Sequence, residues 1–400
     1  MTTSSTRGER TAIVAGGGIG GLAAAIGLRR AGWSVTVLER RPDLGEIGAG
    51  WSFALNAVRA ADALGVGDDL RAVSVPTQAG ATLRTPDGRY LMRFRPDLDM
   101  ALLANHRSDL HRTLLAHVPA ECVRAAAEVT GIEQYEGGAV VAYRTPDGPE
   151  QLTAEVVVGA DGIHSAVRRS VFPDASGPVF QRILCWRGVS ASGSVWPVEG
   201  FQTWGRGARF GAHPLPGQRV FWFLTVRQDQ PGARYDDDPA EIRHRIGDWH
   251  DPITALVDAT PPESILRHDI FDLDPLDTYT DNRVVLLGDA AHAMTPFLAQ
   301  GACQAFEDAT VLTAQLSGDT DIPTALAQYN RLRRPRSQRV QRLARRDPKI
   351  SLSTNPLAYG VMTRLTQMAG GAVAARKSAR LWDWTPPALD QHHANPVEGE

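Results

Sequence analysis

The segment from Thr11 to Glu39 has the pattern of a strand, a glycine-rich turn, a helix and a second strand. Its two strands, Thr11 to Ala15 and Ser34 to Leu38, are short and apolar, and so is the helix from Leu22 to Arg30. The turn contains three glycines spaced as G-x-G-x-x-G, namely Gly16, Gly18 and Gly21. This order predicts a β-α-β unit of the kind that binds dinucleotides.

Each glycine of this turn has a separate role. The first allows a tight turn, the second lets the backbone approach a pyrophosphate, and the third lets helix and strand pack closely. The phosphates would lie at the helix N-terminus, where N–H groups and the dipole favour anions. Glu39 lies 18 positions after Gly21, close to the ~20 expected for an acid that binds a ribose diol. Arg40 and Arg41 would suit a 2′-phosphate, but the charge of Glu39 would repel one. The alternative is a glycine-rich turn that binds nothing.

A second informative segment, Leu286 to Asp308, runs from a strand through Gly-Asp and a proline-containing loop into a new helix. Asp289 lies at the strand end, and Gly301 opens the helix. This layout suits a ligand with hydroxyls at one end and an electron-rich ring at the other. Asp289 can also be the N-cap of a short helix, and the two roles can coexist.

A third segment, Val156 to Arg168, is a buried strand that leads into Asp161 and Gly162. Ser165 and Arg168 follow at helical spacing. Taken alone, this segment is equally typical of an ordinary strand, turn and helix with a capping aspartate.

Together the three segments closely resemble the single-component (group A) FAD-dependent aromatic hydroxylases, the family of p-hydroxybenzoate, salicylate and 3-hydroxybenzoate hydroxylases. GGGIGG with Glu39 and Arg40 is similar to the family's ADP-binding motif, GADGIHSAVR to its DG motif, and LLGDAAHAMTPFLAQGACQAFEDA to its GD motif. The resemblance covers essentially the whole chain. The run Pro-Phe-Leu-Ala-Gln-Gly-Ala is nearest to the salicylate and 3-hydroxybenzoate hydroxylase branch.

The resemblance implies an α/β fold. A Rossmann-like FAD-binding domain of the p-hydroxybenzoate hydroxylase type carries an inserted mixed β-sheet substrate domain, followed by C-terminal helices. The expected FAD-binding domain is discontinuous and takes residues 8–75, 100–178 and 276–345. Residues 76–99 and 179–275 form the substrate domain, 346–388 a C-terminal helical segment, and 389–400 a disordered tail.

Local patterns predict several further elements. Helices are expected at Leu55 to Leu64, Asn105 to His117, Pro239 to Trp249 and Pro252 to Asp258, and hairpins at Ala81 to Phe94 and Val140 to Val158. Strands dominate from Gln181 to Val226. A helix from Ala325 to Arg346 has eight arginines from Arg331 onward, and we expect a solvated helix face there. A nucleic-acid surface would need aromatic interleaving and a basic domain, which this sequence lacks.

Side chains alone cannot transfer hydride or activate O₂, so a flavin must supply that chemistry. The resemblance implies bound FAD, NADH or NADPH as a transient reductant, and O₂ as co-substrate. A flavin C4a-hydroperoxide would then hydroxylate an aromatic or heteroaromatic substrate. Epoxidation or Baeyer–Villiger oxidation of a polycyclic natural product, and urate-type hydroxylation, remain open within the family. A non-catalytic flavin-binding protein is the alternative from another class.

The resemblance also assigns cofactor-binding roles. Asp289 would bind the ribityl hydroxyls, and Arg107 would reach the FAD, although a surface helix residue is its alternative. Asp161 and Arg168 can contribute to binding of the nicotinamide nucleotide rather than to the chemical step. Pro296 would fix the loop at the flavin edge. The flavin N1 side would face a helix start whose dipole carries roughly +0.5 charge, at Gly301, Ala302 and Cys303.

The substrate site is expected on the inserted sheet. Histidine is suited to act as a base near neutral pH, and His213 at a strand end is the candidate, with Gln300 as its partner across the cavity. Its alternative is a strand-end histidine that faces solvent. Arg187 would pair with a substrate anion, or else point outward. Trp204 and Trp222 would roof the cavity, although alternation allows only half of a strand's residues to face it.

Bulk composition excludes several partners. A net charge of −3 indicates neither a nucleic acid nor a membrane surface, and no apolar run of ~18 residues suggests a membrane span. The three scattered cysteines suggest reduced thiols in a cytoplasmic protein. No metal site is expected, and the chain is expected to act as a monomer or homodimer on a small aromatic substrate.

Overall fold

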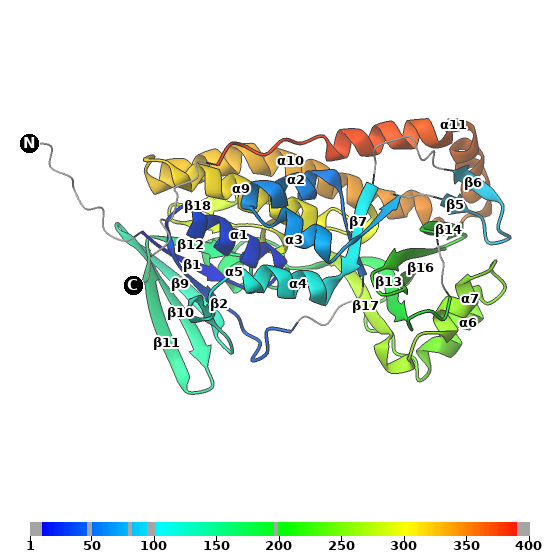
Figure 1. Ribbon diagram of the computed structural model, residues 1–400, viewed down its shortest axis with the longest axis horizontal. Coiled ribbons are helices and arrows are strands. Elements are labelled where there is room, and N and C mark those ends of the chain that lie inside the picture. The colour runs from blue at the N-terminus through cyan, green and yellow to red at the C-terminus, as the bar shows by residue number, and fades with distance from the viewer. Residues whose placement is uncertain (1–9, 46–49, 79–81, 94–100, 196–198, 390–400) are drawn as a thin grey trace, which may run out of the picture.

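The structure is a computed structural model that describes residues 10–45, 50–78, 82–93, 101–195 and 199–389. The expected disordered tail lies outside the described residues from position 390 onward, as do both ends of the hairpin expected at Ala81 to Phe94. Two sheets with separate cores lie at opposite ends of the elongated molecule (Figure 1).

The first sheet has six strands in the order β18-β19-β12-β1-β2-β8. Its centre is β1 (Thr11–Ala15), which pairs in parallel with β12 (Val156–Gly159) and β2 (Ser34–Leu38). The remaining strands are β8 (Val123–Arg124) at one edge, β19 (Val284–Leu286) beside β12, and the antiparallel β18 (Thr280–Asp281) at the other edge. Segments from the start, middle and end of the chain therefore build one nucleotide-binding sheet.

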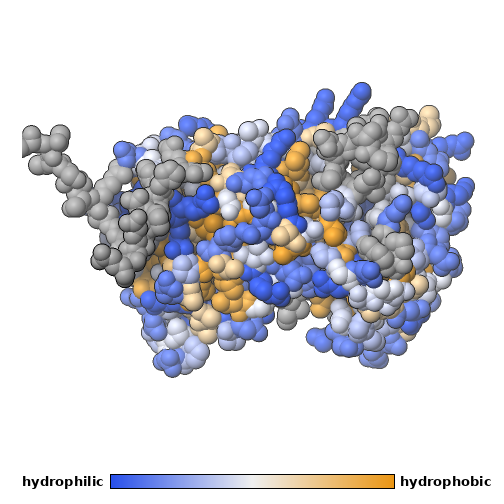
Figure 2. Space-filling model, viewed as in Figure 1, coloured by the Kyte–Doolittle hydropathy of each residue, from blue (hydrophilic) through white to orange (hydrophobic). Residues whose placement is uncertain are grey.

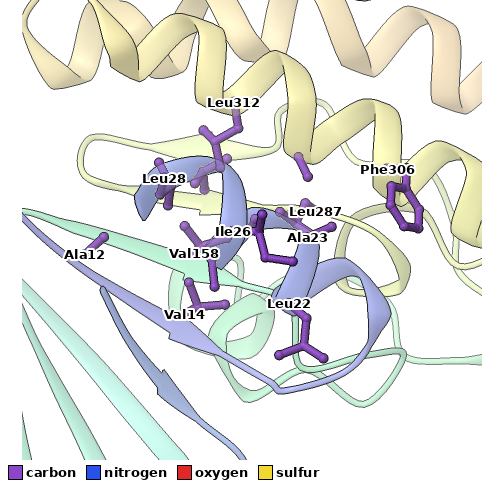
Figure 3. Close-up of a cluster of buried hydrophobic side chains, with 14 of the residues drawn as sticks. Ala12, Val14, Leu22, Ala23, Ile26, Leu28, Val158, Leu287, Phe306 and Leu312 are labelled. Atoms are coloured by element: carbon purple, nitrogen blue, oxygen red, sulfur yellow. The ribbon is translucent and has the colours of Figure 1, made fainter. Parts of the chain in front are cut away.

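Two helices pack closely over this sheet. These are α1 (Ile19–Arg30) and α9 (Gly301–Ser317). Leu22 and Ile26 of α1 lie with Val14 and Val158 of the strands and Phe306 of α9 in one apolar core (Figure 3). A Cβ added at Gly27 would come 2.0 Å from Thr313 Oγ1, so glycine is what allows α1 and α9 to approach.

Other elements of this half correct two expectations. The hairpin of β10 (Gly138–Thr145) and β11 (Gly148–Ala154) joins β9 (Glu128–Tyr135) in a small sheet, whereas Val156 to Val158 belong to β12. The helix α4 (Arg107–Ala116) begins two residues later than expected, because Asn105 and His106 end strand β7 (Ala101–His106). The helices α2 (Leu55–Leu64) and α5 (Ala166–Val171) lie nearby, with α3 (Gly67–Ala72) following α2.

The second sheet has seven strands in the order β17-β13-β16-β15-β14-β5-β6. Its bounds are β5 Thr82–Arg84, β6 Tyr90–Arg93, β13 Val179–Ser190, β14 Phe201–Gly205, β15 Ala208–Leu215, β16 Arg219–Arg227 and β17 Leu266–Asp272. The β14–β5 pair is parallel and its other pairs are antiparallel, so the sheet is mixed. The helices α6 (Asp238–Ile246) and α7 (Ile253–Asp258) cover one face.

A third sheet lies between these two halves. It consists of β3 (Gly50–Phe53), β7 and β4 (Val75–Gln78). The expected domain boundary between residues 75 and 76 therefore falls inside a strand, and the chain passes from one half to the other through this small sheet.

Two long helices, α10 (Ile322–Ser351) and α11 (Pro356–Trp382), run along one edge of the molecule, where hydrophilic side chains project (Figures 1 and 2). The expected solvated face on α10 holds for Arg331, Arg339, Arg342 and Arg346, which are exposed, but not for all eight arginines. Arg333 is fully buried against Glu307 and Asp308, and Arg345 pairs with Asp272. Across the described residues, no helix is long and apolar enough to cross a membrane.

Candidate active site

The glycine-rich turn after β1 is tightly enclosed. Gly16 has φ +104°, and a Cβ there would come 2.4 Å from the carbonyl oxygen of Ala160. A Cβ at Gly21 would come 1.9 Å from the carbonyl oxygen of Gly16. Gly18 is the N-cap of α1 and makes no side-chain capping bond. The backbone is thus free to approach an anion at the helix N-terminus.

A cavity of about 300 Å³ opens beside this turn. Glu39, at the end of β2, lies in its wall and accepts hydrogen bonds from the N–H groups of Gly17 (2.7 Å) and Arg41 (3.0 Å). Several residues expected to bind the cofactor line the same cavity, namely Gly16, Gly18, Glu39, Arg40, Arg107 and Asp161. Four segments that are distant in sequence therefore meet at one site.

Asp161 caps helix α5. Its carboxylate accepts hydrogen bonds from the Ser165 hydroxyl and from the N–H groups of Ala166 (2.6 Å) and Val167 (3.2 Å), and burial raises its pKa. Arg168 is buried and donates to the carbonyl oxygens of Ala290, Ala291 and Asp274, which places it in the packing between α5 and the GD segment. Both side chains therefore have structural partners, and only Asp161 also lines the cavity.

Asp289 begins the short helix α8 (Asp289–His292). Its side chain is exposed. The surrounding protein nevertheless raises the pKa of its carboxyl group by desolvation, and the nearby His292 and Arg107 reduce this increase. This combination is typical of a residue that lines a water-filled recess. A Cβ at Gly301 would come 4.0 Å from Asp289 Oδ1, so the carboxylate and the start of α9 face the same space.

The start of α9 offers backbone groups rather than reactive side chains. Ala302 and Cys303 are buried. Burial raises the pKa of the Cys303 thiol to about 12, so it stays protonated, and it donates to the carbonyl oxygen of Ala299. Pro296 lies in the preceding 3₁₀ turn, η3 (Pro296–Leu298), and is exposed.

Asp308 holds the GD turn in place. It accepts a hydrogen bond from the N–H of Gly288 (2.9 Å), contacts His292 Nε2 at 2.6 Å and pairs with Arg333. Burial alone would raise the pKa of Asp308, but His292 and Arg333 lower it to about 2. His292 therefore has a structural partner.

One face of the seven-stranded sheet turns toward this site, and we call it the inner face. Strand alternation and register place five side chains on it: Arg187, Arg209, His213, Phe221 and Phe223. The ring of His213 stacks against those of Phe221 and Phe223, with centroids 6.5 Å away in both cases. Trp204, opposite Arg209, belongs to the same face.

Trp222 lies on the opposite face. It is fully buried in the core beneath α6 and α7, and its indole donates to Thr260 Oγ1 at 2.8 Å. The expectation that Trp222 contacts substrate is therefore wrong, because alternation turns it away from its neighbours Phe221 and Phe223.

His213 does not face solvent, although it was predicted near a strand end. It is 8% exposed, and Nδ1 is buried with no hydrogen-bond partner among the described residues. Burial, together with the charge of Arg209, lowers the pKa of His213 to about 4. The imidazole is consequently neutral at pH 7 and can accept a hydrogen bond, while the same shift makes it a weaker base than a free histidine.

The inner face meets the nucleotide-binding half directly. Phe297 of η3 and Phe223 pack against the same small cluster, which includes Cys185, and a Cβ at Gly50 would come 2.4 Å from Phe221. Burial lowers the pKa of His268, and the positive charges of Arg187 and Arg107 lower it further. Both arginines therefore lie near this histidine. The loop that precedes α9 therefore lies against the inner face.

Arg209 was not anticipated from the sequence. It is buried, and burial lowers its pKa although Asp347 opposes this. Its guanidinium donates to Gln202 Oε1 and to Asp347 Oδ1 (3.1 Å), and its Cζ lies 5.3 Å from the Phe297 ring centroid. The alternation of Arg209 with His213 in RFGAHPL was the available signal.

Several buried polar atoms in this region have no partner among the described residues. They include Nδ1 of His213, Nε2 of Gln300 and the indole nitrogens of Trp51 and Trp204. An unsatisfied buried polar group costs roughly 1–3 kcal/mol, so native proteins usually provide a partner. A ligand rich in ring nitrogens and oxygens would satisfy these atoms, and the glycine cradle with Glu39 fits an adenine dinucleotide. The residues present therefore suit FAD.

Comparison with known proteins agrees with this geometry. Residues 9–344 match the family described as FAD binding domain. The chain is 35% identical to aurachin C monooxygenase/isomerase of Stigmatella aurantiaca, covering 94% of this chain and 98% of that protein. It is 34% identical to 3-hydroxybenzoate 6-hydroxylase 1 of Aquipseudomonas alcaligenes, covering 83% and 87%. The crystal structure of Klebsiella pneumoniae HpxO with FAD and uric acid superposes with a TM-score of 0.86 at 26% identity, covering 95% and 98%.

The chain belongs to the group A FAD-dependent hydroxylase family. It is a monooxygenase that binds FAD and uses NAD(P)H and O₂, as its sequence resemblance predicted. Bound FAD supplies the electron-transfer and oxygen-activating chemistry; the protein supplies binding, orientation and protection from water.

Proposed function

We propose that this monooxygenase hydroxylates a small aromatic or heteroaromatic compound with an acidic hydroxyl group, bound between the inner face and the start of α9. The observation that carries the proposal is His213, a buried, neutral imidazole that has an unpartnered nitrogen and stacks against two phenylalanine rings. An apolar wall of this kind suits a flat ring, and a neutral imidazole can accept the proton of its hydroxyl group.

In this proposal His213 takes the substrate proton, and the resulting oxyanion makes the ring more electron-rich. Positive charge from Arg187 and Arg209 on the same face favours an anionic substrate. Trp204, whose indole N–H has no partner in the part of the chain that the structure describes, can donate to a substrate oxygen. Phe297 and Phe223, which pack against the same apolar cluster, help to exclude water, which would otherwise compete at the reacting centre.

The cofactor contacts are proposed residue by residue. Gly16, Gly18 and Gly21 let the backbone approach the pyrophosphate, with Glu39 at the adenosine ribose and Arg40 beside it. Asp289 accepts hydrogen bonds from the ribityl hydroxyls, and Arg107 reaches the FAD. Pro296 fixes the flavin edge, and the N–H groups at Gly301, Ala302 and Cys303 face the N1 side. The proposal keeps the domain division expected from the sequence. The FAD-binding domain takes residues 8–75, 100–178 and 276–345, and the substrate domain takes residues 76–99 and 179–275.

A second candidate is urate-type hydroxylation of an N-heterocycle. It is favoured by the TM-score of 0.86 to a structure that holds FAD and uric acid. Epoxidation or Baeyer–Villiger oxidation of a polycyclic natural product uses the same cofactor and remains the third candidate. These candidates differ in the substrate and not in the residues that hold FAD.

The test is NADH and NADPH oxidation by the purified yellow protein, without substrate and with panels of phenolic acids, N-heterocycles including uric acid, and polycyclic phenols. We expect one class to stimulate oxidation and to gain the mass of one oxygen atom, seen by mass spectrometry. Stimulation by N-heterocycles alone would replace the phenolic proposal with the second candidate. Protein that binds no flavin, or that oxidises no compound in any panel, would contradict the proposal.

We further propose that the chain acts as a monomer or homodimer in the cytoplasm. Its three cysteines are unpaired, which suits a reducing compartment. Leu357, Val361, Leu365 and Met368 leave an apolar stripe exposed on α11, which makes that helix the surface to examine for self-association. Light scattering across a concentration series distinguishes the two states.

A further inference from the structure

A buried cluster of amides and charges lies behind the start of α9. It joins Asn56 of α2 with Gln300, Gln304 and Glu307 at the beginning of α9, and with Arg333 of α10. Each of these five side chains is at most 1% exposed. Gln300 is the member nearest the ligand site, because it directly precedes Gly301.

The charge of Glu307 fixes how two amides are oriented. Burial opposes its ionisation, but Arg333 and Arg336 lower its pKa, so Glu307 is a carboxylate that can only accept hydrogen bonds. The groups facing it at 2.6 Å and 3.0 Å must therefore be the NH₂ groups of Asn56 and Gln304. Arg333 fixes Gln304 independently, because its guanidinium can only donate and lies 2.8 Å from Gln304 Oε1.

These two amides fix the orientation of Gln300 in turn. The same NH₂ groups of Asn56 and Gln304 lie 3.1 Å and 3.2 Å from one terminal atom of Gln300. Since both neighbours donate, that atom must be the carbonyl oxygen. The NH₂ group of Gln300 then points away from the cluster, and it is buried without a partner among the described residues.

We infer that Gln300 is a hydrogen-bond donor whose polarity is set by Glu307 through Asn56 and Gln304, and that it binds an acceptor atom on the ligand at the start of α9. A flavin carbonyl or ring nitrogen and a substrate oxyanion share this acceptor chemistry. Asn56, Gln304 and Glu307 are positioning residues. The identity of the ligand rests on the proposed function, whereas the orientation of the amide does not.

The inference has a consequence for specificity. A ligand that presents only a donor at this position, such as a ring N–H, meets the NH₂ group of Gln300 and is left unsatisfied, whereas an oxyanion, a carbonyl oxygen or a hydroxyl oxygen can accept from it. Gln300 cannot rotate its amide to compensate, because its NH₂ would then face the donors of Asn56 and Gln304. The site therefore selects a ligand atom that directs a lone pair at Gln300 over one that directs an N–H there.

The central experiment is Gln300→Glu. The introduced carboxyl group still accepts from Asn56 and Gln304, so the cluster keeps its internal bonds, but the outward donor becomes an acceptor when ionised. Dissociation constants would be measured for FAD with apoprotein, and for 3-hydroxybenzoate and uric acid by the change in flavin absorption. The flavin midpoint potential would be measured in parallel.

We expect one of these ligands to bind about tenfold more weakly at pH 8, the loss of one charge-assisted hydrogen bond. Weaker FAD binding and a lower flavin potential identify the flavin as the acceptor; weaker binding of an anionic probe alone identifies the substrate. Affinity should recover as pH falls, because a protonated carboxyl group can donate again. Affinities and a flavin potential that equal those of the wild type at every pH would overturn the inference.

The positioning role is tested with Gln304→Met and Asn56→Leu, which remove the donors to Gln300. The matched control is Gln338→Met, another buried amide, which lies outside the cluster and whose Nε2 donates to the carbonyl oxygen of Leu276. All three variants should lose thermal stability, but only the first two should weaken the ligand that Gln300→Glu weakens. Equal effects of all three on that ligand would show a merely structural role. Binding and potential need no turnover, so this result stands apart from any failure of the proposed reaction.

Discussion

The two walls of the active site differ in how their polar groups are satisfied. On the cofactor wall, Glu39 accepts two backbone hydrogen bonds, Asp161 caps α5, and Asp308 is held by His292 and Arg333. On the inner face, His213 Nδ1 and the Trp204 indole nitrogen are buried without partners among the described residues. These three carboxylates of the first wall therefore have partners within the protein, whereas the two ring nitrogens of the second would gain partners from a ligand.

This difference separates stability from activity. Changes in the cofactor wall disturb bonds that the fold itself uses, so they should destabilise the protein and weaken FAD binding together. Changes to His213 or Trp204 on the inner face remove ring nitrogens that have no partner among the described residues, so near pH 7 they should alter turnover more than stability. Gln300, at the start of α9, combines both conditions. Its side-chain oxygen accepts hydrogen bonds inside the protein, whereas its NH₂ group has no partner among the described residues.

The largest effect is expected for Gly16→Ala on the cofactor wall. The added methyl group meets the Ala160 carbonyl at 2.4 Å, at a φ of +104°. We expect FAD binding to be lost and the free energy of unfolding to fall by roughly 3 kcal/mol or more. Gly131→Ala is the control, since a Cβ there has open space. Normal flavin content in the Gly16 variant would show that the turn does not constrain the cofactor.

Arg333→Met tests the ionic support of the same wall. It leaves the buried carboxylates of Glu307 and Asp308 without their main counter-charge. We expect a loss of about 3–5 kcal/mol in the free energy of unfolding, measured by urea denaturation. Arg342→Met, at an exposed position on the same helix, should change it by less than about 0.5 kcal/mol. Equal losses in the two variants would contradict the difference between buried and solvated arginines.

His213→Ala tests the inner face. We expect kcat/KM to fall about 100-fold through loss of the base, with unchanged FAD affinity. The acid limb of the wild-type pH profile should lie below pH 5, since the pKa of His213 is about 4 in the free protein. Full coupled turnover in the variant would exclude His213 as the base.

The same histidine makes stability depend on pH in a defined direction. Its pKa falls from 6.5 in the unfolded chain to about 4 in the folded protein, so the neutral form is favoured by folding. The free energy of unfolding keeps its full value above pH 6.5. It falls by about 3 kcal/mol at most as the pH drops toward 4, because the folded protein resists protonation of His213. Urea denaturation of wild type and His213→Ala between pH 4 and 7 checks this, because the variant should lose less stability on acidification.

The smallest effects should come from a pair of tryptophans on opposite faces of the sheet. Trp222→Phe loses the hydrogen bond to Thr260 and should cost about 1 kcal/mol of stability without altering KM. Trp204→Phe should leave stability nearly unchanged and raise KM several-fold. Thermal melts and steady-state kinetics on the two variants provide the comparison. An unchanged KM for Trp204→Phe would remove it from the substrate site.

Much of the cofactor wall could be predicted because its signals are local. The glycine spacing, the helix Leu55–Leu64 and the strand that ends at Glu39 each depend on residues close in sequence. The expectation for Trp222 failed for a physical reason. Alternation shows that Phe221 and Trp222 face opposite sides of a strand, but only the packing of α6 and α7 decides which side is the core. The expectation for α10 failed similarly at Arg333, since its burial depends on carboxylates in another helix.

The sequence by itself determined the β-α-β unit, the family and the cofactor, because each follows from motifs whose residues act through backbone geometry over short distances. Only the tertiary structure decided which side chains face the substrate and which way the Gln300 amide points. That orientation passes from Arg333 through Glu307 to Asn56 and Gln304, on three separate helices. Hydrogen-bond polarity of this kind is a property of atoms brought together by folding, and no spacing along the chain encodes it.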